Sequence, residues 1–195
     1  MNIAIIPTYN PDIKLVELVE ELIERKIGNV IVVNDGSKEQ THKIFEMLSD
    51  KAIILTHDIN QGKGAAIKTA LKYISESLTD IGGIVILDAD GQHRPEDAMR
   101  LLDEVHQNVS GLVLGVRRFE GEIPLRSLFG NTITKYVFRL CSGKWVSDTQ
   151  TGLRAFKAGL ISDLLSASGT KYEYEMNVLL TCLKKAMSVA NAVQS

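Results

Sequence analysis

The sequence predicts an α/β fold in which helices cover both faces of a mostly parallel sheet. Short β-branched runs alternate with segments whose apolar residues recur at helical spacing. The runs are apolar throughout, which is typical of strands buried on both faces. Five strands are expected, at residues 3–6, 30–33, 52–55, 84–87 and 112–115. Four helices are expected between them, at residues 13–26, 40–48, 64–75 and 96–106.

The first strand and helix show this pattern clearly. The strand is an unbroken apolar run from Ile3 to Ile6. The helix that follows carries its apolar residues at helical spacing, at Leu15, Val16, Leu18, Val19, Leu22 and Ile23. The later units repeat the alternation, so the sequence predicts a Rossmann-like sheet.

Beyond residue 115 the alternation ends. Residues 125–141 predict a helix with a broad apolar face formed by Phe129, Ile133, Tyr136, Val137 and Phe138. This is more apolar surface than a small sheet needs, so we expect the helix to touch a membrane or a lipid acceptor. The alternative is a helix packed on the core. A further helix is expected over residues 174–185.

The composition indicates one ordinary globular domain, since the chain has 195 residues of which 45% are hydrophobic. A net charge of −2 offers no field that would attract nucleic acid, so no nucleic-acid partner is expected. Cys141 and Cys182 form no C-x-x-C pattern, which argues against a zinc site or a disulfide scaffold. We find neither a signal peptide nor an apolar stretch of about 20 residues. The prediction is a cytoplasmic protein that, if it works at a membrane, is peripheral on its cytoplasmic face.

Polar residues stand where the predicted strands end, and ligands bind beyond the carboxyl ends of parallel strands. The first strand is followed by Pro7, Thr8, Tyr9 and Asn10. Asp35 ends the second strand, where an acidic residue commonly accepts hydrogen bonds from a ribose or base. The alternative is an Asx turn that closes the strand.

Asp88 and Asp90 stand two residues apart at the end of an apolar strand, so both carboxylates can point to one side. Mg²⁺ or Mn²⁺ prefers oxygen ligands and binds through one or two carboxylates plus substrate phosphates. Gln92 offers an amide oxygen. A bare D-x-D pattern is more often a solvated turn, but its place at a strand end favours a metal site. His93 is expected to form hydrogen bonds and not to bind the metal.

Two nucleotide-binding alternatives are disfavoured. The first strand-helix turn lacks G-x-G-x-x-G, and the segment Gln61 to Gly64 is not a Walker loop. Gly62 and Lys63 are expected to present backbone amides and an ammonium to the nucleotide, against the alternative of a plain helix start. Four arginines, whose guanidinium groups suit phosphate oxygens, follow the fifth strand at Arg117, Arg118, Arg126 and Arg154.

Six motifs in order resemble the inverting family 2 glycosyltransferases of GT-A fold, and among them the dolichyl-phosphate mannose synthase-like branch that uses polyprenyl phosphates. The resemblance runs from residue 3 to about 183. The motifs are PTYN at 7–10, VNDGS at 33–37, NQGKG at 60–64, DADGQH at 88–93, DTQTGLRAF at 148–156 and YEYEM at 172–176.

The resemblance implies a nucleotide-sugar-binding half at residues 1–116 and an acceptor-side half at 117–195, in one domain. It assigns the nucleoside to Pro7, Tyr9 and Asp35, and adds Thr8, Asn10 and Ala89 to the nucleotide-sugar site. It assigns the metal to Asp88, Asp90 and Gln92, and phosphate contacts to Arg117, Arg126 and Arg154. Position 11 is proline, where the family often has an acidic residue. Relatives continue past the last helix into another strand, so the resemblance predicts a chain truncated at its C-terminus.

The reaction implied is displacement at the anomeric carbon, with the nucleoside diphosphate leaving and the metal neutralising its charge. Asp90 is expected to be the principal ligand. A polyprenyl phosphate acceptor, with a second pKa of about 6, needs no general base. A hydroxyl acceptor needs one, for which Asp148, Glu173 and Glu175 are candidates. A third alternative is a protein that binds a nucleotide sugar without turnover, and a homo-oligomer stays open.

Overall fold

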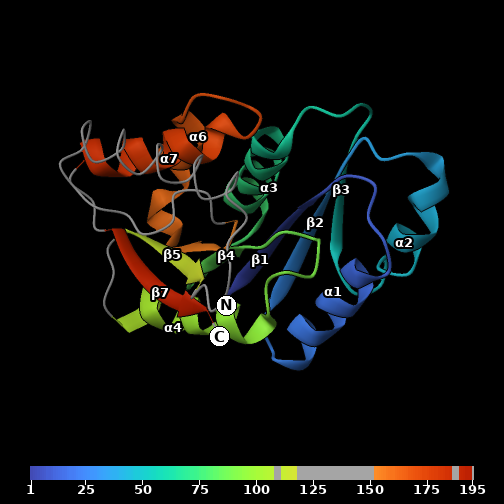
Figure 1. The fold of residues 1–195 in the computed structure, drawn as a ribbon, viewed down its shortest axis with the longest axis horizontal. Coiled ribbons are helices and arrows are strands. Elements are labelled where there is room, and N and C mark those ends of the chain that lie inside the picture. Colours follow the sequence, from blue (N-terminus) through green and yellow to red (C-terminus); the bar gives the residue numbers. More distant parts are fainter. Residues whose placement is uncertain (108–110, 118–151, 186–188, 195) are drawn as a thin grey trace, which may run out of the picture.

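The structure, a computed structural model, describes residues 1–107, 111–117, 152–185 and 189–194. The prediction of an α/β fold with a mostly parallel sheet is confirmed. Seven strands of the described residues form one sheet in the order β3-β2-β1-β4-β6-β5-β7 (Figure 1). The strands are β1 (Ile3–Thr8), β2 (Asn29–Asp35), β3 (Ile53–His57), β4 (Ile84–Ile86), β5 (Leu112–Arg117), β6 (Arg154–Phe156) and β7 (Val189–Gln194).

The helices connect these strands and cover both faces of the sheet. They are α1 (Lys14–Glu24), α2 (His42–Glu46), α3 (Lys63–Ser77), α4 (Pro95–Gln107), α6 (Ile161–Ser166) and α7 (Glu173–Lys184), with short 3₁₀ turns η1 (Glu39–Thr41) and η2 (Ala158–Leu160). The single helix predicted over residues 40–48 is thus η1 followed by α2. The helix predicted over residues 125–141 lies outside the described residues.

Alternate residues of each strand point to opposite faces, and this builds two cores. Ile3 and Ile5 of β1 pack with the buried faces of α3, α6 and α7. Ala4 and Ile6 of the same strand pack with α1, α2 and α4. Burial on both faces explains the continuous apolar runs within the central strands β1, β2 and β4.

The part of the sheet from β3 to β4 is parallel, with Ile3 of β1 opposite Asn29 of β2 and Ile84 of β4. The carboxyl ends of β1, β2 and β4 therefore meet at one edge. β6 is antiparallel to both neighbours, with Arg154 opposite Ile86 of β4 and Leu114 of β5.

The strand order beyond β4 was not predicted. Residues 154–156 stood within a recognised motif and were not expected to form a strand. The expectation that no strand follows the last helix was wrong, because residues Val189–Gln194 form β7 and pair in parallel with β5. No helix of the described residues is long and apolar enough to cross a membrane.

Candidate active site

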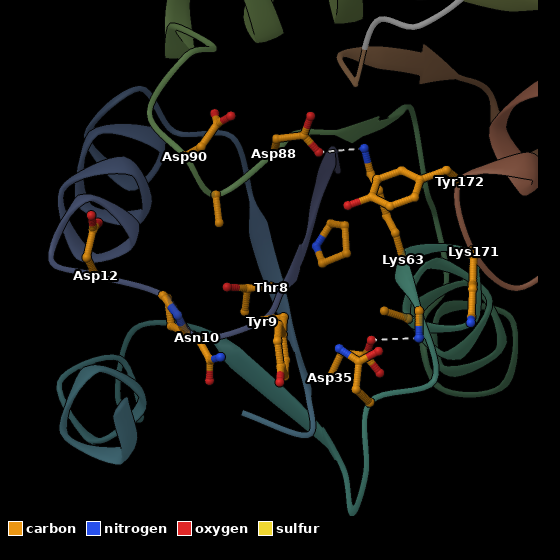
Figure 2. Close-up of a pocket in the computed structure, with 16 residues that line it drawn as sticks. Thr8, Tyr9, Asn10, Asp12, Asp35, Lys63, Asp88, Asp90, Lys171 and Tyr172 are labelled. Atoms are coloured by element: carbon orange, nitrogen blue, oxygen red, sulfur yellow. Dashed lines mark hydrogen bonds and ion pairs between the residues drawn. The ribbon is translucent and has the colours of Figure 1, made fainter. Parts of the chain in front are cut away.

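A pocket of about 730 Å³ opens at the edge where the carboxyl ends of β1, β2 and β4 meet. The start of α3 and the residues just before α7 complete it. Figure 2 shows Asp88 and Asp90 at one end of the opening, Tyr9 and Asp35 at the other, and Lys171 and Tyr172 along one side. The lining residues are Pro7, Thr8, Tyr9, Asn10, Pro11, Asp12, Asp35, Asn60, Gly62, Lys63, Ala66, Asp88, Ala89, Asp90, Lys171 and Tyr172.

The loops after β1 and β2 are held together by reciprocal hydrogen bonds. The Asn10 amide donates to Ser37 Oγ at 2.9 Å, and the Lys38 amide donates to Asn10 Oδ1 at 2.9 Å. Asn10 has a φ of 51°, the left-handed region that asparagine tolerates better than most residues. These contacts place the exposed ring of Tyr9 beside the pocket.

Asp35 is buried at the end of β2 and anchors the loop before α3. Its Oδ1 accepts hydrogen bonds from the Gln61 amide at 2.8 Å and from His57 Nδ1 at 2.7 Å. Its Oδ2 accepts one from the Gly62 amide at 2.8 Å. The carboxylate thus has a structural task in addition to its place in the pocket wall. Gly36 follows with a φ of 69°, where a Cβ would lie 2.3 Å from the Ile59 carbonyl carbon.

The glycines of the NQGKG motif let the start of α3 approach the segment before α7. A Cβ at Gly62 would lie 2.6 Å from the Thr170 carbonyl oxygen, and one at Gly64 would lie 2.5 Å from Tyr174 Cβ. The Ala65 amide donates to the Thr170 carbonyl oxygen at 2.9 Å. This close packing brings Lys171 and Tyr172, which follow Thr170, to the pocket.

Lys63 is the centre of a cluster of partly buried charges. Its Nζ lies 2.6 Å from Asp88 Oδ1 and 3.0 Å from Glu175 Oε1. Burial alone would lower the pKa of the Lys63 ammonium, but the Glu175 and Asp88 carboxylates outweigh burial and raise that pKa. The ammonium is therefore firmly protonated.

Glu175 is in turn held by Arg154. The guanidinium Nη1 of Arg154 donates to the Glu175 carbonyl oxygen at 2.7 Å, and Nη2 lies 3.7 Å from Glu175 Oε1. Arg154 is buried in β6 and does not line the pocket. The expectation that Arg154 contacts phosphate stays a prediction, since the described contacts of its guanidinium are with Glu175.

Asp88 is enclosed on three sides. Besides Lys63, the ring nitrogen Nε2 of His93 lies 3.5 Å from Asp88 Oδ2, longer than a good hydrogen bond. A Cβ at Gly152 would lie 1.9 Å from Asp88 Oδ2. Burial opposes ionisation of Asp88, but His93 and Lys63 outweigh it and hold the pKa of Asp88 well below its usual range.

Asp90 is exposed and lines the pocket. Its Oδ1 accepts a hydrogen bond from the Gln92 amide at 2.9 Å, so its Oδ2 is open to a ligand. No group of three or more His, Cys, Asp or Glu side chains in the described ranges could hold a metal by itself. Oxygen ligands of this kind fit Mg²⁺ or Mn²⁺ when substrate phosphates complete the shell.

The structure brings most of the expected site residues together. All the expected nucleotide-sugar residues apart from Arg117 line the pocket, as do Asp88 and Asp90. Gln92 is exposed next to Asp90 but does not line the pocket. The backbone of Arg117 ends β5, while its side chain lies outside the described residues. Arg118, Arg126 and Asp148 also lie outside them.

Three features of the site were missed by sequence reasoning. His57 was assigned nothing, although its place at the end of β3, in register with Asp35, was a usable signal. Lys171 stands next to a recognised motif but was not considered. Gly152 lies within a motif, and its closeness to Asp88 depends on the position of β6 beside β4.

Comparison with known proteins supports the family resemblance of the sequence motifs. Residues 3–164 match the family model of Glycosyl transferase family 2. The chain is 31% identical to a UDP-N-acetylglucosamine--dolichyl-phosphate N-acetylglucosaminyltransferase of Methanococcus voltae, over 95% of this chain and 81% of that protein. It is 26% identical to a polyprenol monophosphomannose synthase of Mycolicibacterium smegmatis, over 96% of this chain and 74% of that protein.

Solved structures share the fold. Glucosyl-3-phosphoglycerate synthase from Mycobacterium tuberculosis, in complex with Mn²⁺, uridine diphosphate and phosphoglyceric acid, superposes with a TM-score of 0.76 at 17% identity, covering 99% of this chain and 68% of that one. Because the family match spans most of the chain and the pocket joins its motifs at one sheet edge, the protein belongs to glycosyl transferase family 2 and is a glycosyltransferase of GT-A fold.

Proposed function

We propose that this protein transfers a sugar from a nucleoside-diphosphate sugar to a polyprenyl phosphate, with Mg²⁺ or Mn²⁺ as cofactor. The observation that carries the proposal is the pocket itself, in which the Asp88 and Asp90 carboxylates stand at one end and Tyr9 and Asp35 at the other. This arrangement suits a diphosphate at the acidic end and a nucleoside at the other.

Asp90 would be the principal metal ligand, because one of its oxygens is open at the pocket. Asp88 is already paired with Lys63 through Oδ1, and Gln92 adds an amide oxygen next to Asp90. The metal, when bound, would neutralise charge that builds on the departing diphosphate. The protein's own part is to hold Asp90 and Asp88 in one geometry at the end of β4.

The remaining wall of the pocket would bind the donor. Tyr9, Asp35 and Pro7 would contact the nucleoside, and the Gly62 backbone, which lines the pocket, would lie beside it. Lys171 would add positive charge, since its side chain lines the pocket while the other lining lysine is engaged by two carboxylates. Electrostatic attraction of this kind favours an anionic donor.

A phosphate acceptor fits the described residues better than a hydroxyl does. A dianionic phosphate attacks without a general base. Of the candidate bases, Glu175 is held between Lys63 and Arg154, and Glu173 accepts hydrogen bonds from the Thr170 and Lys171 amides. The named activities of the Methanococcus voltae and Mycolicibacterium smegmatis relatives, each acting on a dolichyl phosphate or polyprenol, support the same acceptor class. Arg117 and Arg126 remain candidates for contacts with its phosphate.

The test is transfer from radiolabelled UDP-N-acetylglucosamine, UDP-glucose and GDP-mannose, each with and without polyprenyl phosphate. We expect labelled lipid from one donor, in Mn²⁺ or Mg²⁺ but not in EDTA. Asp90→Asn, which keeps shape and removes charge, should abolish the product. If product formed only with a glycan alcohol, the acceptor would be a hydroxyl group and not a polyprenyl phosphate. Donor binding with no product on either acceptor would indicate a binding protein.

A further inference from the structure

A buried histidine, His57, contacts a residue of the pocket wall and has no part in the proposed chemistry. His57 ends β3, and its side chain is 7% exposed. One ring nitrogen, Nδ1, lies 2.7 Å from Asp35 Oδ1, and the other, Nε2, lies 2.8 Å from Thr69 Oγ1 of α3. A chain of hydrogen bonds therefore runs from the middle of α3 to an acidic residue in the pocket wall.

The direction of these hydrogen bonds follows from the chemistry of the groups. Asp35 already accepts from the Gln61 and Gly62 amides, so the carboxylate is an acceptor and His57 Nδ1 must donate to it. In a neutral imidazole the other nitrogen then accepts, and the Thr69 hydroxyl is its donor. The Asp35 carboxylate thus sets the tautomer in which Nδ1 carries the proton, and the Thr69 hydroxyl, which can donate or accept, adapts to Nε2 and holds the ring in place.

The consequence for Asp35 is a fixed orientation. A carboxylate has about four acceptor positions, two on each oxygen. The two on Oδ1 are used by His57 and Gln61, and one on Oδ2 is used by Gly62. The remaining position lies on Oδ2 of a residue that lines the pocket.

We propose that His57, oriented by Thr69, is a positioning residue that holds Asp35 so that its Oδ2 accepts a hydrogen bond from the nucleoside of the donor. The inference rests on the proposed donor site and adds to it the residues that orient its nucleoside end. A buried polar pair is commonly no more stable than an apolar pair of the same size. The contact of His57 with a carboxylate that lines the pocket therefore points to orientation of Asp35 and not to stability.

The experiment measures the dissociation constants of UDP and UMP by calorimetry, in EDTA and in Mn²⁺, for four variants. His57→Phe keeps a ring but has no nitrogen. His57→Asn keeps an amide donor at the position of Nδ1. Thr69→Val removes only the hydroxyl. Ile74→Val trims a buried side chain farther along α3, away from Asp35, and serves as the stability control.

We expect His57→Phe to weaken UDP and UMP binding by the same factor, about tenfold, because a hydrogen bond to a charged group is lost from the nucleoside end. Thr69→Val should weaken both about threefold. His57→Asn should recover most of the affinity, and the gain on adding Mn²⁺ should be unchanged in all variants. Ile74→Val should lower the melting temperature without changing either constant.

Three results would overturn the inference. These are wild-type affinity in His57→Phe, equal losses in His57→Phe and His57→Asn, and a loss confined to UDP with UMP unaffected, which would place the effect on the diphosphate. If the wild-type protein binds GDP in place of UDP, the same measurements are made with GDP and GMP. If it bound neither UDP nor GDP in Mn²⁺, the donor site itself would fail and the inference with it. Wild-type UDP binding with unaffected variants would reject the role of His57 alone.

Discussion

The Lys63 ammonium lies 2.6 Å from the Asp88 carboxylate, so the first acidic residue of the DAD motif is already paired with a protein cation. Asp90, two residues on, is exposed and keeps an open oxygen at the pocket. The two aspartates therefore differ in what they can do. Asp88 is held by Lys63 and bordered by His93 and Gly152, whereas Asp90 is available to a cation from solvent.

Metal removal should weaken nucleotide binding. Without a cation, the diphosphate would face the Asp90 carboxylate unscreened, so UDP should bind at least about tenfold more weakly in EDTA than in Mn²⁺. Asp90→Ala should remove this difference, because the repulsion and the ligand disappear together. Calorimetry with UDP measures both effects. Equal affinity in EDTA and Mn²⁺ for the wild type would refute the metal assignment.

Gly152→Ala should displace Asp88, although Gly152 itself does not line the pocket. The new Cβ would lie 1.9 Å from Asp88 Oδ2, so the carboxylate must move away from Lys63. We expect the Mn²⁺-dependent gain in UDP affinity and the transfer rate to fall about tenfold or more, since an error of about 1 Å in a catalytic group costs about 100-fold. Gly159→Ala is the matched control, because a Cβ there meets nothing within 4 Å. Equal behaviour of the two variants would contradict the prediction.

Glu175→Gln should destabilise the fold and slow transfer. The change leaves the Lys63 ammonium and the Arg154 guanidinium without their shared carboxylate in a buried setting. Removing one partner of a buried ion pair costs about 3 kcal/mol in the free energy of unfolding. Urea denaturation measures this loss. Glu173→Gln, on the same helix but exposed, should change the free energy of unfolding far less.

The Cys182 thiol should react slowly with alkylating agents in the folded protein. Burial raises the pKa of this thiol to about 11, so little thiolate forms at pH 8. Mass spectrometry after iodoacetamide treatment should find Cys182 unmodified until the protein is unfolded in urea. Rapid modification of Cys182 in the native protein would show that it is accessible.

The same shift predicts a loss of stability at high pH. The pKa of Cys182 in the folded protein lies above the value of 9.0 of a free thiol. The contribution of Cys182 to stability is therefore complete below pH 9 and is lost as the pH rises towards 11, because the unfolded chain releases its proton first. The slope is at most about 1.4 kcal/mol per pH unit. Cys182→Ala should remove the contribution of Cys182 to the pH dependence of the free energy of unfolding and leave the contributions of the other titrating groups unchanged.

Arg126→Lys tests the acceptor side. Lysine keeps the charge but loses the planar fork that binds two phosphate oxygens. If Arg126 contacts the acceptor phosphate, single-turnover transfer to polyprenyl phosphate should fall about tenfold or more while UDP affinity stays constant. Arg25→Lys, on the surface beside Glu96, is the control. A wild-type rate in Arg126→Lys would remove this residue from the mechanism.

The parts of the fold that could be predicted are those that follow from patterns among neighbouring residues. The five predicted strands and three of the four helices between them all exist within a few residues of their predicted ends, because periodicity and apolar runs are properties of neighbouring residues. The three-residue strand β6 was beyond this kind of reasoning. It is too short to show a period, and its antiparallel position between β4 and β5 depends on contacts distant in sequence.

The same division holds in the site. The sequence by itself determined that Tyr9, Asp35, Asp88 and Asp90 meet at one edge, because the carboxyl ends of parallel strands converge there. Only the tertiary structure decided which partner each charge faces. Arg154 has the chemistry of a phosphate ligand, yet β6 places it in the core against Glu175. The energy of a charge depends on the distance to its neighbours and on their exposure to water, and both are set by packing between distant segments.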